Sequence, residues 1–197
     1  MPPSDEEILH LWELYHEAED YISEISSIWN GLDATAVNQL RYSGRHLLNA
    51  LTKKTSVSEQ EEYRRSVNHA KRAIFDALDS GIIYCLQKVD LFKIDYRKIE
   101  VTTPGYQEII ALARQAKRLL DEARRNFDNR QEYYEDARTH FKTLKKVCET
   151  LEDSRPEQNK RLRAYNRNIL LTWVAVVSLA FTAVAAIFTT LAYYNSP

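Results

Sequence analysis

Two arginine–histidine pairs are the residues of this chain whose types and spacing suit acid–base chemistry. Arg41 precedes His46 by five positions, and Arg64 precedes His69 by the same interval. A histidine exchanges a proton near neutral pH, and a nearby guanidinium stabilises negative charge on a phosphate. Each pair therefore predicts general acid–base catalysis beside an electrostatic clamp as one candidate chemistry.

The second pair, within Arg64-Arg65-Ser66-Val67-Asn68-His69, resembles the R-x4-6-H motif of HEPN domains. HEPN domains are all-helical bundles that are often ribonucleases, and the resemblance covers residues 59–80. It implies a dimer that joins two motifs, a metal-independent cleavage and an RNA substrate. His69 would then handle the proton of the attacking 2′-hydroxyl, and Arg64 would steady the phosphate. The alternative places His69 on the flank or surface of its helix.

A wider group of basic side chains lies on two neighbouring predicted helices. Guanidinium groups bind phosphate through paired N–H donors, so this group predicts a pocket for a phosphate-bearing signal. The alternative is a set of solvated helix faces, with Arg72 forming an ordinary intrahelical ion pair with Asp76. The group comprises Arg41, Arg45, His46, Lys71 and Arg72.

Other enzyme signatures are missing from the sequence, and its composition points away from nucleic-acid binding. GxxxxGK[ST], GxGxxG, HExxH and CxxC do not occur, and 27 basic residues balance 28 acidic ones. Cys85 and Cys148 fall on helical core positions without metal-ligand spacing, which predicts reduced, buried thiols. We therefore expect no metal or other cofactor, and a non-enzymatic role is favoured over an enzymatic one.

The strongest signal is an uncharged apolar stretch near the end of the sequence. Ile169 to Ala192 is almost continuously apolar, and no charged residue occurs between Asn168 and Pro197. A helix rising about 1.5 Å per residue covers about 36 Å here, enough to cross a hydrocarbon core of about 30 Å. We expect a transmembrane helix over 168–194, followed by a short external tail, 195–197.

The residues before this stretch predict the orientation. Positive charge beside a span stays cytoplasmic, and the charged sequence from Met1 to Trp29 lacks the apolar core of a signal peptide. We expect a single-pass protein of the inner or plasma membrane with its N-terminal domain in the cytoplasm. The basic residues of this juxtamembrane segment, 156–167, are Lys160, Arg161, Arg163 and Arg167.

One face of the predicted span carries small or weakly polar residues at intervals of three or four. Such faces let two helices approach closely and share hydroxyl hydrogen bonds. This pattern predicts self-association into a homo-oligomer within the bilayer; a plain anchor is the alternative. The face consists of Thr172, Ala175, Ser178, Thr182, Ala186 and Thr189.

Residues 1–155 are predicted to form an all-α, elongated antiparallel bundle, since apolar residues recur every three or four positions. Helices are expected to begin at Ser4, Asp33 and Ser58, and the first to end at Asn30-Gly31. A loop follows over Ile94–Thr103, with Pro104 as the first helical residue after it.

The stripe from Tyr106 to Leu151 keeps one register, which favours a single long helix with coiled-coil character. Two helices broken near Asn126–Asn129 are the alternative. Pro156 is expected to break or kink the chain before the span.

Three functional classes follow. The first is a membrane effector that self-associates and acts on the bilayer, and its layout resembles accessory membrane effectors of prokaryotic antiphage systems. The second is a tail-anchored HEPN-like ribonuclease. The third is a non-enzymatic scaffold or tether whose coiled-coil face binds a protein partner. The first is favoured because it uses the strongest signal in the chain.

Overall fold

The computed structural model describes residues 2–29, 31, 33–53, 56–126 and 132–194, with side chains up to Leu191. Within this part of the chain the fold is all-α, as predicted, with no strand. The predicted tail, 195–197, and the helix-ending residue Asn30 lie outside the described residues. The helices are α1 (Asp5–Trp29), α2 (Ala34–Thr52), α3 (Glu59–Asp95), α4 (Tyr106–Arg125) and α5 (Tyr134–Tyr194).

The first three helices begin where side chains can satisfy free backbone N–H groups. Ser4 and Glu7 form a reciprocal capping box before α1. Asp33 accepts hydrogen bonds from two backbone N–H groups at the start of α2. Ser58 accepts one from the backbone of Glu61 at 3.2 Å. These three predicted helix starts are confirmed.

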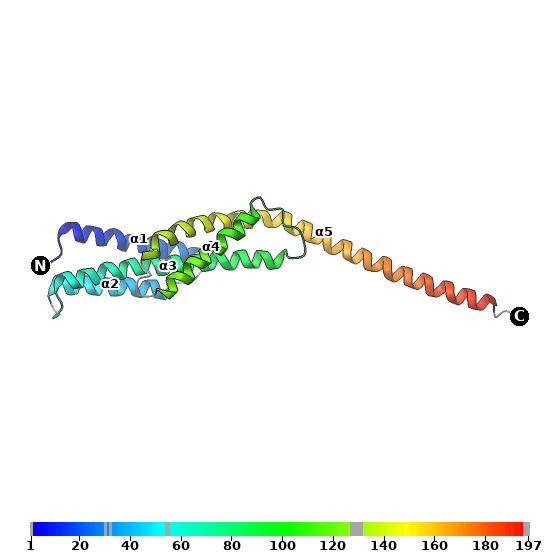
Figure 1. The fold of residues 1–197 in the computed structure, drawn as a ribbon, viewed down its shortest axis with the longest axis horizontal. Helices are drawn as coiled ribbons and strands as arrows, with labels where there is room; N and C mark the ends of the chain where they lie inside the picture. Colours follow the sequence, from blue (N-terminus) through cyan, green and yellow to red (C-terminus); the bar gives the residue numbers. More distant parts are fainter. Residues whose placement is uncertain (1, 30, 32, 54–55, 127–131, 195–197) are drawn as a thin grey trace.

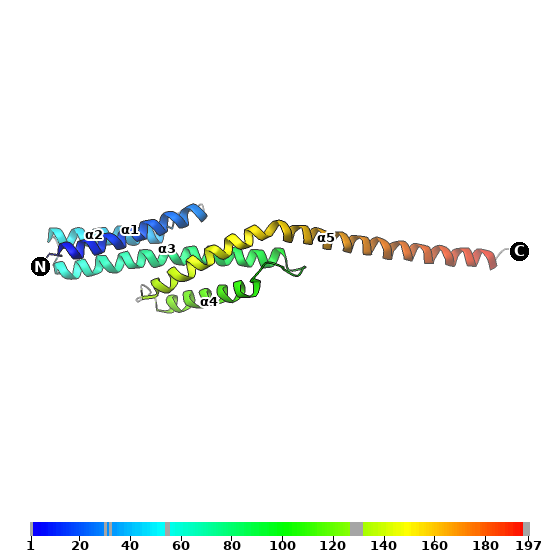
Figure 2. The ribbon, with the colours of Figure 1, turned by 90° about the horizontal axis from the view of Figure 1, so that it is seen from above.

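α3 is the central helix of an elongated bundle. Figure 2 shows α1 and α2 side by side along its first half, and α4 with the beginning of α5 along its second half. Hydrogen-bonded pairs fix the direction of α2: Ser43 contacts Ser66, and Gln39 contacts His69, so α2 runs opposite to α3. Beyond the bundle, α5 projects alone to the end of the described chain (Figure 1).

A glycine in α3 allows two other helices to meet at one point. A Cβ atom at Gly81 would lie 2.6 Å from the ring of Phe141 on α5 and 2.9 Å from Ile25 on α1. Near the other end of α1, the Tyr63 hydroxyl donates to the Glu7 carbonyl at 2.8 Å, so α1 and α3 are parallel. Glycine therefore provides the space for this close three-helix contact.

The expectation of one helix from Tyr106 to Leu151 is wrong. α4 ends at Arg125, and α5 begins at Tyr134, so the alternative with a break near Asn126 is confirmed; residues 127–131 lie outside the described part. The chain reverses because α4 and the start of α5 both bury their apolar stripes in the bundle core. One register persists because each helix independently presents the same kind of face to that core.

Two smaller expectations also need correction, and of the two alternatives for Pro156 the kink agrees with the structure (Figure 2). α3 continues through Ile94 to Asp95, so the loop begins later than predicted. Gly105, with φ of 67°, precedes the first residue of α4, so Pro104 lies outside the helix. Pro156 lies inside a continuous α5 and does not end it. Figure 2 shows α5 changing direction in this yellow-to-orange region, which agrees with a kink.

Candidate functional site

The last part of α5 is the most unusual surface of the molecule. From Ile169 to Leu191 its side chains are all exposed, and it includes large residues such as Trp173 and Phe188. Among the described residues, α5 is the one helix long and apolar enough to cross a membrane. Because large exposed apolar patches mark interaction surfaces, this segment is the candidate surface for contact with a membrane or with another protein.

Threonine hydroxyls on the predicted small face of this segment donate hydrogen bonds within their own helix. Thr172, Thr182 and Thr189 each donate to the carbonyl four residues earlier, at 2.7–2.9 Å. The hydroxyl hydrogens are thus used within the helix, which suits an apolar environment. The small residues therefore favour close helix packing, and only the hydroxyl oxygens remain as acceptors for a neighbouring helix.

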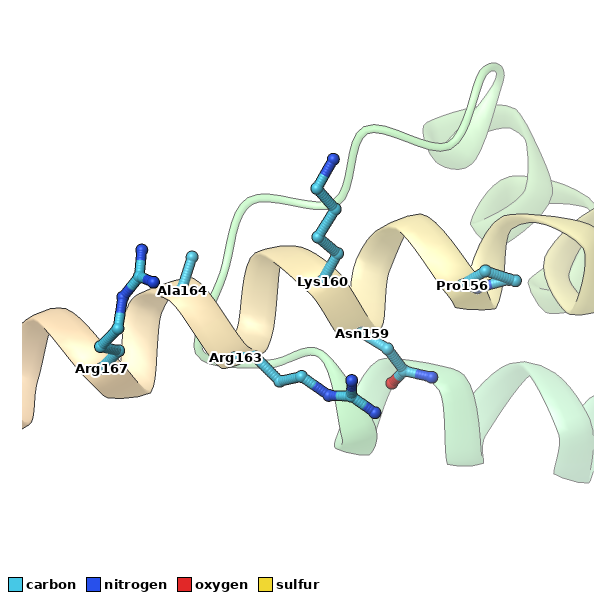
Figure 3. Close-up of a pocket in the computed structure, with 6 residues that line it drawn as sticks. All are labelled: Pro156, Asn159, Lys160, Arg163, Ala164 and Arg167. Carbon is cyan, nitrogen blue, oxygen red and sulfur yellow. The ribbon is translucent and has the colours of Figure 1, made fainter.

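The predicted juxtamembrane basic residues divide into two sets. Lys160, Arg163 and Arg167 line a surface hollow of about 690 Å³ with Pro156, Asn159 and Ala164. Figure 3 shows Lys160 and Arg167 extending on the same side of α5, with Ala164 between them, while Arg163 points to another side. None of these three has an ion-pair partner within the described residues, and the sequence holds no acidic residue after Glu157.

Arg161, the fourth basic residue, faces the bundle. Its guanidinium donates to the Glu100 carbonyl, in the loop between α3 and α4, at 3.0 Å. Arg155, six residues earlier, forms an ion pair with Asp95 at 2.9 Å. One arginine thus anchors the loop, and three cationic side chains remain for an anionic partner.

Polar contacts hold that loop firmly against α5, a feature that the sequence did not indicate. The buried Tyr96 donates its hydroxyl hydrogen to Asn159 at 2.9 Å, and Thr103 contacts Ser154 at 3.0 Å. We call the contacts of Tyr96, Thr103 and Arg161 with α5 and the loop the collar. The collar joins the bundle to α5 just before the apolar segment.

Gln158 contributes a further contact to the same junction. Its side chain is 1% exposed, and its amide donates to the Thr102 hydroxyl at 3.1 Å. A polar residue two positions after a proline gives no sign in the sequence that it is buried, and its partner lies 56 positions away. Sequence periodicity therefore could not identify it.

The predicted catalytic residues Arg64 and His69 point to different sides of α3. Five residues correspond to about 140° around a helix. Arg64 is exposed and pairs with Glu61 at 2.9 Å. The ring of His69 is half-buried between α2 and α3, where Nδ1 lies 2.7 Å from the Gln39 amide oxygen. Within one chain, this geometry does not bring the two side chains together.

The structure instead joins the two histidines of the two motifs. The rings of His46 and His69 stack with centroids 5.1 Å apart. His46 also contacts the buried carboxylate of Glu62 at 2.6 Å. Burial, the His46 ring and the guanidinium groups of Arg72 and Arg45 lower the pKa of His69 to about 4. His69 is therefore neutral at pH 7, and Nδ1 donates its hydrogen to Gln39.

The predicted phosphate-binding group is assembled only in part. The exposed guanidiniums of Arg41 and Arg45 each lie 5.4 Å from the centre of the Tyr42 ring. The Glu62 carboxylate already contacts His46, and its negative charge opposes binding of a second anion there. No hydrogen bond or ion pair joins Lys71 to this group among the residues described. Arg72 lies close enough to influence His69 electrostatically.

The two cysteines are free and adjacent. Cys85 is buried, and the thiol of Cys148 lies 3.8 Å from the Cys85 carbonyl. A hydrogen bond with the Cys148 thiol and burial raise the pKa of Cys85, so its thiol is unreactive. Across the described residues, no three His, Cys, Asp or Glu side chains converge to hold a metal ion.

Comparison of this chain with protein-family models, curated proteins and solved structures gave no match. The functional argument therefore rests on the apolar segment of α5, the basic side chains before it and the collar.

Proposed function

We propose that this chain is a membrane effector: a cytoplasmic helical bundle whose single span self-associates and perturbs the bilayer. The observation that carries the proposal is the fully exposed apolar end of α5, which is long enough to cross a membrane. A role in antiphage defence is the biological setting that the layout suggests. Under this proposal, lipid and further copies of the chain are the principal partners.

The orientation follows from the charges beside the span. Lys160, Arg163 and Arg167 would lie at the cytoplasmic headgroups, where anionic lipids attract basic side chains by about 1 kcal/mol each. The bundle then lies in the cytoplasm, and the inner or plasma membrane is the proposed location. The hollow lined by these residues (Figure 3) would accommodate lipid phosphate.

The small face supplies the proposed mechanism of assembly. Small residues at Ala175, Ser178 and Ala186 allow backbones to approach closely, and packing drives association in lipid. A ring of such helices would direct threonine oxygens inward and form a small pore. The span contains no charged residue, so it lacks the kind of side chain that marks a dedicated ion pathway.

The test compares two identical substitutions on opposite faces of the span. Ala186→Leu adds bulk to the small face. Ala180→Leu adds the same bulk to another face, because residue 180 lies two positions before Thr182 and about 160° away from it around the helix. Bacteria expressing each full-length version, and a His69→Ala version, are followed for growth and for entry of a membrane-impermeant dye. We expect dye entry with the unaltered chain, with Ala180→Leu and with His69→Ala, and its loss with Ala186→Leu.

Other results would favour the remaining classes. Growth arrest without dye entry that is cured by His69→Ala would favour the ribonuclease. Dye entry that is equally lost with both leucine variants would refute the face-specific assembly. A tether would retain its activity when an unrelated span replaces residues 168–194.

A further inference from the structure

The loop between α3 and α4, residues 96–105, lies at the end of the bundle nearest the apolar segment of α5. Figure 1 and Figure 2 show the bundle and the rest of α5 along nearly one line, with this green loop beside the point where α5 leaves the bundle. The Arg161 guanidinium contacts the Glu100 carbonyl, and Arg161 is seven residues before Asn168. At about 1.5 Å per residue, this contact is about 10 Å from the start of the apolar segment.

A tight turn at the start of this loop carries two adjacent basic residues. The Ile99 amide donates to the Tyr96 carbonyl at 3.1 Å, so Arg97 and Lys98 are the two central residues of a four-residue turn. Both side chains are exposed, and neither has a hydrogen-bond or ion-pair partner among the described residues. Within the described chain, two positive charges thus lie just after α3 without an acidic partner.

Arg163 brings a third positive charge to the same side of α5. Tyr96 donates its hydroxyl hydrogen to Asn159, which places the end of α3 beside that residue. Arg163 is four residues later, and residues four apart are neighbours on one helix face. Figure 3 shows the Arg163 side chain pointing toward the end of α3. We call Arg97, Lys98 and Arg163 the turn cluster.

Positive charge is in excess at this end of the bundle. Asp95, the last residue of α3, is already paired with Arg155 at 2.9 Å. Beyond this ion pair, residues 96–105 and 156–167 together contain six basic residues and two acidic ones, Glu100 and Glu157. The position of these two acidic residues therefore decides whether the turn cluster keeps its charge.

Both acidic residues are placed on the side of α5 opposite the turn cluster. Glu157 is two residues before Asn159, and Arg161 is two residues after it. Two residues correspond to about 160°, measured the shorter way around a helix. Arg161 holds the Glu100 carbonyl, so the Glu100 backbone lies with it. The end of α3, bound to Asn159 through Tyr96, is therefore across α5 from both.

We propose that the turn cluster binds phosphate groups of anionic lipids, so that the bundle itself docks on the membrane surface. Guanidinium and ammonium groups bind phosphate oxygens. The headgroup layer extends about 5–8 Å beyond the hydrocarbon core, within reach of long basic side chains at this level of α5. The inference rests on the proposed function, because it requires the span to lie in the bilayer with the bundle on its cytoplasmic side.

Lipid binding at the turn cluster differs from a general attraction of α5 to the membrane. Basic residues on α5 alone would leave the bundle free to tilt about the start of the span. A contact at the end of α3 adds a second point of attachment, and the collar joins that point to α5. Anionic lipid would then hold the loop and the end of α3 at the membrane surface.

The test uses the full-length chain in two kinds of lipid nanodisc, one of phosphatidylcholine alone and one that also contains phosphatidylglycerol. Amide hydrogen exchange, followed by mass spectrometry, reports separately on residues 96–103 and on residues 169–191. Because an anionic surface attracts each nearby basic side chain by about fivefold, we expect residues 96–103 to exchange about tenfold more slowly in the phosphatidylglycerol discs. Residues 169–191 should be protected equally in both discs.

Arg97→Gln/Lys98→Gln is the decisive variant, and Lys117→Gln/Arg118→Gln is its control. Each removes two adjacent positive charges. Lys117 and Arg118 are exposed on α4 and have no ion-pair partner among the described residues, and α4 leads from the loop back along the bundle (Figure 2). We compare the ratio of exchange rates between the two discs within each variant. The decisive variant should lose most of the lipid-dependent protection, and the control should keep it.

Three results would overturn the proposal. The first is equal exchange of residues 96–103 in the two discs while residues 169–191 are protected, which would leave the proposed span intact. The second is the same lipid dependence in the decisive variant as in the control. The third is protection of residues 96–103 by inorganic phosphate in phosphatidylcholine discs, which would assign the turn cluster to a free phosphate compound. Rapid exchange of residues 169–191 in both discs would instead refute the proposed span, and this inference with it.

Discussion

Acidification is expected to weaken the packing of α2 against α3 through His69. The charged groups around this ring are Arg45 and His46 from α2 and Arg72 from α3, and the Glu62 carboxylate contacts His46. The lowered pKa of about 4 means that the folded chain resists protonation of His69. The unfolded chain, with an ordinary pKa of 6.5, binds that proton readily.

The sign and size of the effect follow from this difference. As the pH falls below 6.5, the unfolded state gains a proton that the folded state lacks, so the free energy of unfolding falls until the pH reaches about 4. With these two pKa values, the free energy of unfolding falls by at most about 1.8 kcal/mol between about pH 7 and about pH 5. Because the ring is half-buried and partly screened by water, we expect about 1 kcal/mol.

The assay is urea unfolding of the full-length chain in detergent, followed by circular dichroism at several pH values. His69→Asn keeps a donor near Gln39 but removes the titrating ring. On acidification, the free energy of unfolding of this variant should therefore fall by about 1 kcal/mol less than that of the unaltered chain. His10→Asn, at an exposed position, is the control and should follow the unaltered chain. Identical pH slopes for His69→Asn and the unaltered chain would refute the reasoning.

Two further predictions concern packing and the collar. Gly81→Ala should destabilise the bundle by about 1–3 kcal/mol, because the new Cβ would lie 2.6 Å from Phe141. Gly44→Ala, whose nearest neighbour would be 4.0 Å away, should be neutral or stabilising by up to about 1 kcal/mol, and thermal unfolding distinguishes the two; equal effects would contradict the close contact. Tyr96→Phe should lower the free energy of unfolding by about 1 kcal/mol by removing the hydrogen bond to Asn159. In a double-mutant cycle with Asn159→Ala the two losses should not add, and strict additivity would argue against this bond.

The sequence was most informative where the signal is local. The capping residues Ser4, Asp33 and Ser58 lie within one turn of the helices that they start, so their effect is readable from adjacent positions. The apolar stretch of α5 is likewise a property of consecutive residues. The break after Arg125 was not favoured because no glycine or proline marks it and both flanking helices pack on one core.

Contacts between distant residues could not be predicted in the same way. Tyr96 and Asn159 are 63 positions apart, and neither residue type indicates a buried hydrogen bond by itself. His46 and Glu62 meet because antiparallel helices fix their register, and that register is not visible before the turn between α2 and α3 is known. The arginine–histidine spacing was real, but helical geometry turns Arg64 and His69 apart.

The collar bears on how the proposed span would be used. An anchor needs only a covalent connection, and a flexible linker would provide it. Here a single helix passes from the bundle into the apolar segment, and the junction is fixed to the loop by Arg161 and by the buried Tyr96 and Gln158. A packed, hydrogen-bonded junction would transmit a shift of the bundle to the proposed span, because such interfaces move as units. This construction favours a span whose position depends on the bundle, and it therefore supports the effector over the simple tether.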